Sequence, residues 1–215
     1  MCLFGGSNEK KSDGPGASST SAEAGTEQYR SVFLLVHPSP KFKAHWGLFI
    51  PESGDSVRKG RMIDVNGNVR EGFKMRFRRN YNMDVTQRKP YPPIEIGRVS
   101  TDHLADTRGD GVYRKDTEPK DAIEEIIASV PAPGPSLNSV SGGSATQANS
   151  HVQLLTSLVC KAPSGPRPRV ELSDCQWWTL RCVEKLEERG YLIPPTGGDH
   201  KGMNPVDIVK GAPKH

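Results

Sequence analysis

Cys175 lies where the backbone is expected to favour a reactive thiol. The segment DCQWW (residues 174–178) reads as the start of a helix, with Ser173 or Asp174 as N-cap and Gly190 as a helix stop. A first-turn thiol is close to the positive end of the helix dipole and to backbone N–H groups, which stabilise the nucleophilic thiolate. The charge of Asp174 acts in the opposite direction. Cys175 is therefore a candidate nucleophile, and the alternative is a small apolar residue buried at the helix start.

A cysteine nucleophile needs a base, and His45 is the candidate among six histidines. It opens the apolar segment HWGLFI and, by the alternation of a strand, shares one face with Gly47 and Phe49. Gly47 leaves room for another group to approach the imidazole. The alternative is a structural histidine at the end of a strand.

Asp64 is the candidate for the group that orients the imidazole and stabilises its cation. It is a lone carboxylate between Ile63 and Val65, in the strand expected directly after that of His45. If the two strands pair, Asp64 faces the same side as His45. The alternative is a strand-end aspartate that leads into a tight turn at Asn66-Gly67.

Along the chain, the expected strands mostly precede the expected helices. We expect a hairpin from residues 29–37 and 44–51 with a loop at 38–43, a second hairpin around Asn66-Gly67, and a short strand at 92–100. One helix is expected around Ile123, Ile126 and Ile127, ending at Pro131, and another begins near Asp174. This order predicts an α+β fold, a small antiparallel sheet with packed helices.

The domain organisation follows from composition. Only 34% of the residues are hydrophobic, and there are 22 glycines and 18 prolines, so one domain diluted by irregular segments is expected. We predict a disordered tail at 1–28, a single domain at 29–193 with a Pro/Gly/Ser-rich loop at 131–150, and a loose C-terminal tail at 194–215. Residues 151–163 fit a helix or a strand equally well.

The four cysteines, at positions 2, 160, 175 and 182, have no zinc-type spacing, and the chemistry considered above needs no metal or organic cofactor. The N-terminal residues do not predict a signal peptide, and no apolar run approaches membrane-spanning length. Because free thiols are typical of cytoplasmic proteins, a cytoplasmic location is expected. The formal net charge of +4 is too small to indicate nucleic-acid binding by itself.

The segment KMRFRRNY (residues 74–81) interleaves basic and aromatic side chains, which is also found where proteins bind single-stranded nucleic acid. Strand alternation instead places Lys74, Arg76 and Arg78 on one face, opposite the apolar residues. That arrangement is typical of a half-buried strand with a solvated outer face, so nucleic acid is not the expected partner.

The order of these motifs resembles the permuted papain-like arrangement of lecithin:retinol acyltransferase-like proteins and NlpC-type peptidases. More closely, the chain resembles a group of uncharacterised fungal proteins over residues 29–193. The shared pattern consists of short motifs in a fixed order: HWGLFIP (45–51), GRMIDVNG (60–67), GFKMRFRRNY (72–81), VPAPGPSL (130–137) and DCQWW (174–178).

The resemblance implies that His45 is the base and Cys175 the nucleophile, with Asp64 in place of the family's second histidine. Asp174 replaces an asparagine, and Gln176 becomes a candidate donor to an oxyanion or a solvated first-turn side chain. The implied function is a cysteine-dependent hydrolase or acyltransferase acting on an amide or ester of a small molecule, lipid or peptide. The alternative is a non-catalytic binding or scaffold module with the same fold. The sequence does not predict the oligomeric state.

Overall fold

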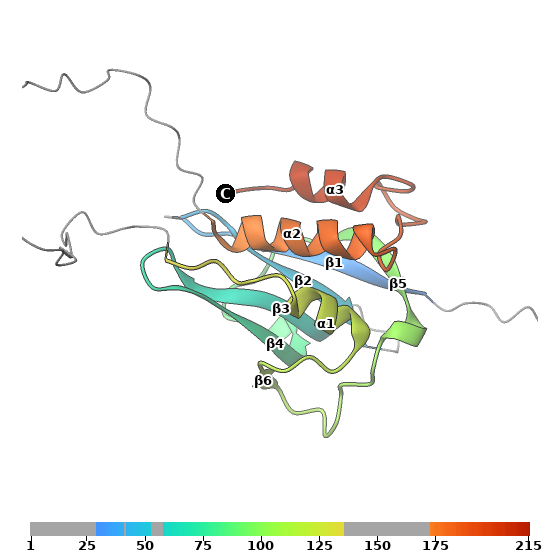
Figure 1. The fold of residues 1–215 in the computed structure, drawn as a ribbon, viewed down its shortest axis with the longest axis horizontal. Coiled ribbons are helices and arrows are strands. Elements are labelled where there is room, and N and C mark those ends of the chain that lie inside the picture. Colours follow the sequence, from blue (N-terminus) through green and yellow to red (C-terminus); the bar gives the residue numbers. More distant parts are fainter. Residues whose placement is uncertain (1–28, 41, 53–57, 136–172) are drawn as a thin grey trace, which may run out of the picture.

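The computed structural model describes residues 29–40, 42–52, 58–135 and 173–215 (Figure 1). The predictions for the tail at 1–28, for residues 151–163 and for most of the loop at 131–150 lie outside the described residues.

The sheet contains six strands, and every neighbouring pair is antiparallel. The strands are β1 (Tyr29–His37), β2 (His45–Pro51), β3 (Lys59–Asn68), β4 (Gly72–Asn82), β5 (Ile94–Ser100) and β6 (Arg114–Asp116). Their spatial order is β5-β1-β2-β3-β4-β6, which places β2 and β3 at the centre. The α+β class, the β1–β2 hairpin and the strand at 92–100 are confirmed. The short β6 was not anticipated.

The turn between β3 and β4 lies further along the chain than predicted. Asn66 and Gly67 pair with β4 inside the ladder, and the reversal occurs between Asn68 and Gly72. The Asn68 side chain accepts hydrogen bonds from two backbone N–H groups of the turn, and Gly72 adopts a φ of 85°, which glycine tolerates best. The hairpin is therefore correct, but the Asn-Gly turn assignment is wrong.

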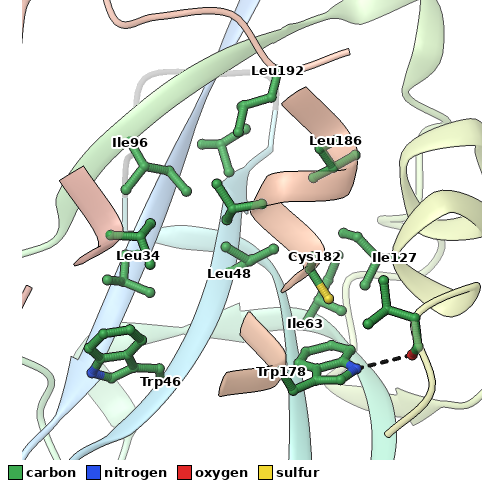
Figure 2. Packing of buried hydrophobic residues seen from close by; sticks show 14 of the residues in the cluster. Leu34, Trp46, Leu48, Ile63, Ile96, Ile127, Trp178, Cys182, Leu186 and Leu192 are labelled. Atoms are coloured by element: carbon green, nitrogen blue, oxygen red, sulfur yellow. Dashed lines mark hydrogen bonds between the residues drawn. The ribbon is translucent and has the colours of Figure 1, made fainter. Parts of the chain in front are cut away.

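Three helices cover one face of the sheet: α1 (Ala122–Ala128), α2 (Cys175–Glu188) and α3 (Pro205–Gly211) (Figure 1). The apolar face of α2 is buried, and Trp178, Cys182 and Leu186 pack with Leu48 and Ile63 of the central strands (Figure 2). The indole Nε1 of Trp178 donates to the carbonyl of Val130, which joins α2 to the segment after α1. None of the helices in the described part of the chain has the length and apolar character needed to cross a bilayer.

The other face of the sheet carries a smaller apolar cluster, formed by Leu35, Phe49, Met62, Tyr81 and Met83. Strand alternation therefore buries β2 on both faces, since Trp46 and Leu48 point to the helices while Phe49 points away from them. His45 and Asp64 belong to this second face, which has no α-helix in its apolar cluster.

The C-terminal segment is packed, so the prediction of a loose tail at 194–215 is wrong. The helix α3 has Asn204 as its N-cap, and Val206, Ile208 and Val209 are buried in the main core. After α3 the chain is fixed by its backbone carbonyls: that of Pro213 accepts from Trp46 Nε1, and that of Lys214 accepts from the Ala44 N–H. The prediction failed because these acceptors are main-chain atoms, which the side-chain pattern does not reveal.

A buried ion-pair network ties α1 to the sheet. Glu124 is fully buried, and its carboxylate accepts from the guanidinium groups of Arg61 in β3 and Arg79 in β4. Arg61 also pairs with Asp121, the N-cap of α1. Because each charge has an opposite partner, the network holds α1 against the strands without leaving an isolated buried ion.

Candidate active site

The site is built at one end of the sheet, where β2 begins and where α2 begins. His45 is the first residue of β2, Asp64 lies on the neighbouring β3, and Cys175 is the first residue of α2. Gly47 permits the approach of Asp64, because a Cβ atom there would lie 2.7 Å from Met62 Cε and 3.2 Å from Asp64 Cβ. The three sequence-predicted residues are therefore brought together, although they lie far apart in the chain.

Asp64 is a fully buried carboxylate with several donors. His45 Nε2 lies 3.0 Å from Asp64 Oδ2, and Arg76 donates from Nε to Oδ1 at 2.5 Å and from Nη2 to Oδ2 at 2.9 Å. The Arg76 fork and the imidazole thus fix both oxygens, and burial, which alone would raise the Asp64 pKa, is outweighed by these contacts, which hold the pKa well below its usual range.

The same contacts set the charge of His45. Burial disfavours the charged imidazole, but hydrogen bonds to Asp64 and Cys175 outweigh it and raise the pKa of His45 to about 9. His45 is therefore protonated at neutral pH. Because Nε2 is engaged with Asp64, the remaining ring nitrogen, Nδ1, is left for the thiol.

Cys175 is largely buried, and its Sγ lies 3.9 Å from the carbonyl oxygen of Ala44, the residue before His45. The start of α2 is therefore anchored directly at the start of β2. The Cys175 thiol borders the main apolar core and also interacts with His45, whereas Cys182 is fully buried in that core. Burial raises the pKa of the Cys182 thiol well above its ordinary value, so that second cysteine of α2 stays protonated.

Asp174 caps α2, and its charge is compensated. One carboxylate oxygen accepts from the backbone N–H groups of Gln176 and Trp177, and the other lies 2.9 Å from Lys43 Nζ. The negative charge that the sequence places beside Cys175 is thus offset by a cation and by two helix N–H groups. Lys43 was not identified from the sequence, because it comes from the loop before β2 and meets Asp174 only in the fold.

Gln176 has a different role from the one predicted. Its side-chain amide donates to the carbonyl of Ala44 at 2.9 Å and to the carbonyl of Lys214 at 3.0 Å. Both amide hydrogens are therefore used. Gln176 links α2, β2 and the C-terminal segment, and its assignment as an oxyanion donor is corrected.

His37 is a second histidine at the site that the sequence did not single out. It faces His45 across the β1–β2 ladder, with 6.1 Å between the ring centroids. Burial, together with the charges of His45 and Arg78, outweighs its hydrogen bond to the Arg88 carbonyl and lowers the pKa of His37 to about 4. His37 is therefore neutral next to a charged imidazole.

Arg76 was expected on a solvated face, and this expectation is wrong. Its guanidinium is the main partner of Asp64, because the register sets Asp64 directly opposite Arg76. The sequence would have predicted the pair of Asp64 and Arg76 only if the position of the β3–β4 turn, and with it the strand register, had been known. Among the described residues, no group of three or more His, Cys, Asp or Glu side chains is arranged to hold a metal ion.

A family of unknown function, DUF6540, matches residues 32–193, which is more than half of the chain. The chain belongs to this family. The DUF6540 segment runs from β1 to just beyond α2 and includes His45, Asp64 and Cys175, whereas α3 lies outside it. No curated protein and no solved structure matches the chain significantly.

Proposed function

We propose that this protein is a cysteine-dependent hydrolase or acyltransferase that acts on an amide or ester. The observation that carries the proposal is the position of His45, which contacts the buried Asp64 carboxylate with Nε2 and interacts with the Cys175 thiol. A nucleophile, a base and a group that orients the base are the components of nucleophilic acyl transfer.

In the proposed reaction, Cys175 reacts as a thiolate beside protonated His45, whose Nδ1 holds the former thiol proton, and the thiolate attacks the substrate carbonyl carbon. The tetrahedral intermediate expels an amine or an alcohol, which takes the proton from His45, and a thioester on Cys175 remains. Water or another acceptor then attacks the thioester while His45 removes its proton. The thiolate leaves, and the product is a free acid or a transferred acyl group.

The oxyanion would be stabilised at the start of α2. Asp174 engages the N–H groups of Gln176 and Trp177, while no described residue accepts a hydrogen bond from the N–H of Cys175. This N–H belongs to the nucleophile itself and lies at the positive end of the helix dipole. We assign it as the oxyanion donor in place of the Gln176 side chain.

The proposed relationship is to permuted papain-like enzymes. It is supported by the chain order, with histidine at the start of a strand, its polar partner on the next strand and cysteine at the start of a helix. The second candidate is a binding or scaffold module of the same fold, which the burial of Cys175 favours.

The test is formation of an acyl-enzyme with p-nitrophenyl acetate. Mass spectrometry of the intact protein and its peptides should show an acetyl group on Cys175, and Cys175→Ser and His45→Ala should lack the thioester. The wild-type protein remaining unmodified, or an equal acetyl level in His45→Ala, would favour the binding module. Cys182→Ser serves as a matched control, because the second cysteine of α2 lies in the core.

A further inference from the structure

The face of β4 that carries Arg76 presents a second guanidinium, that of Arg78, to the Asp64 carboxylate. Arg78 lies two residues further along this face, with its Nη1 3.6 Å from Oδ2 of Asp64. That oxygen is the one that contacts His45, and both oxygens are already held by Arg76. Arg78 therefore lies next to the site without a carboxylate at hydrogen-bonding distance.

The guanidinium of Arg78 is held in place by uncharged groups. Its Nε donates to the Tyr113 hydroxyl at 3.0 Å, its Nη1 approaches Met62 Sδ at 3.3 Å, and its Cζ lies 4.4 Å from the centroid of the Tyr81 ring. No described residue accepts a hydrogen bond from Nη2. Because the side chain is 19% exposed, it is positioned and desolvated but still open to a ligand.

The charges of this cluster are unbalanced. The single carboxylate of Asp64 faces three cations, namely protonated His45, Arg76 and Arg78. A thiolate on Cys175 would offset one of them in the proposed mechanism, which leaves one positive charge in a partly buried place. A partly desolvated cation attracts a substrate anion more strongly than a solvated one does.

We infer that the acyl substrate carries an anionic group, a carboxylate or a phosphate, and that Arg78 binds it beside His45. This inference rests on the proposed function, since the anion and the reacting carbonyl belong to one molecule. The planar fork of arginine matches the oxygens of either group. Arg78 would then select substrates by charge, whereas Arg76 would maintain the charge and orientation of the base.

The test compares thiol reagents that differ only in one charge. Iodoacetylglycine, iodoacetyl-β-alanine and iodoacetyl-γ-aminobutyrate are each paired with the corresponding primary amide, and iodoacetyl-phosphoethanolamine is paired with iodoacetyl-ethanolamine. In each reaction the Cys175 sulfur bonds to carbon and iodide leaves. Peptide mass spectrometry gives the rate at Cys175 for each reagent.

We expect at least one anionic reagent to label the wild-type protein faster than its neutral partner, and the pair that does so separates carboxylate from phosphate recognition. Arg78→Met should lower this anionic-to-neutral rate ratio by about tenfold, the size of one charge-assisted hydrogen bond, and the ratio within one variant cancels any change in the reactivity of Cys175 itself. Arg78→Lys, which keeps the charge but loses the fork, should give an intermediate ratio. Arg189→Met removes the same charge at the opposite end of α2 and should leave the ratio unaltered.

Two outcomes would overturn the inference about Arg78 and leave the proposed function standing. Neutral reagents could label the wild-type protein as fast as anionic ones, or the anionic-to-neutral rate ratio could fall equally in Arg78→Met and Arg189→Met. If every reagent labels Cys175 as fast in His45→Ala as in the wild-type protein, the proposed function fails as well. The wild-type comparison needs no substitution, so it decides the question even if Arg78→Met does not fold.

Discussion

His45 holds its proton because two partners favour the charged form. Its folded-state pKa of about 9 exceeds the ordinary value of 6.5, so the folded protein keeps a proton that the unfolded chain releases between these pH values. The contribution of His45 to stability is therefore complete below pH 6.5 and is lost as the pH rises through about 9.

The first prediction follows from the direction of this shift in the His45 pKa. Urea unfolding of the wild-type protein should show a free energy of unfolding that falls by on the order of 2–3 kcal/mol across this alkaline window, and His45→Gln should lack that fall. His37 acts in the opposite window, because its contribution is present above pH 6.5 and is lost as the pH falls to about 4. His37→Gln should therefore retain the alkaline decline, whereas a decline of equal size in His45→Gln would contradict the assignment.

Lys43 determines how strongly Asp174 opposes a thiolate. The two side chains form an ion pair at the start of α2, and Lys43 is half exposed. Lys43→Met should slow iodoacetamide alkylation of Cys175 about two- to fivefold, the range of an exposed ion pair. Adding Asp174→Asn should restore the rate, since asparagine caps a helix without the charge. An unchanged rate in Lys43→Met would show that Asp174 is harmless without its partner.

The site residues differ in how far the sequence reveals them. Cys175, His45 and Asp64 could be selected from residue type, strand alternation and chain order. Arg76, Arg78 and Lys43 could not, because their roles depend on the β3–β4 register and on a contact between a loop and a distant helix. Gln176 was correctly placed in the first turn, but its two carbonyl partners are backbone atoms of other elements.

At the scale of elements, the C-terminal segment holds together the two elements that bear the base and the nucleophile. The carbonyls of Pro213 and Lys214 accept hydrogen bonds from Trp46, Ala44 and Gln176, at the start of β2 and α2. The end of the chain lies beside the start of α2 (Figure 1). This segment therefore acts as a structural support for the site.

Removal of residues 213–215 should lower the free energy of unfolding by about 2–4 kcal/mol, since three donors lose their acceptors. Lys214→Ala is the matched control, because it keeps every backbone carbonyl and should change stability little. Urea unfolding of the two variants measures the difference. Equal stability of the truncated and full-length chains would contradict a supporting role.

At the scale of the whole molecule, the α+β class and five of the six strands follow from the sequence, because apolar alternation and turn residues specify them locally. The packing of the last helix and the burial of charge do not follow. Glu124 and Arg79 are brought into contact only by the fold. Burial of an ion pair depends on partners from distant elements, which no local pattern encodes.

The ion-pair network around Glu124 is predicted to affect the stability of the fold and not the reactivity of Cys175. Glu124→Gln leaves Arg61 and Arg79 short of a buried counter-charge and should destabilise the fold by about 3–5 kcal/mol. Glu125→Gln, on the exposed side of the same helix, should have little effect. Thermal unfolding measures both, and folded Glu124→Gln should alkylate at Cys175 at the wild-type rate. Equal stability of the two variants would refute the role of the network.

The central claim is that His45 activates Cys175, and the pH dependence of iodoacetamide alkylation at Cys175 tests it most directly. Because the thiolate is the reacting form, the wild-type protein should be labelled at neutral pH faster than an ordinary free thiol. His45→Ala should lose this reactivity and react only as the pH approaches that of ordinary thiol ionisation. Identical pH profiles for the wild-type protein and His45→Ala would contradict the account.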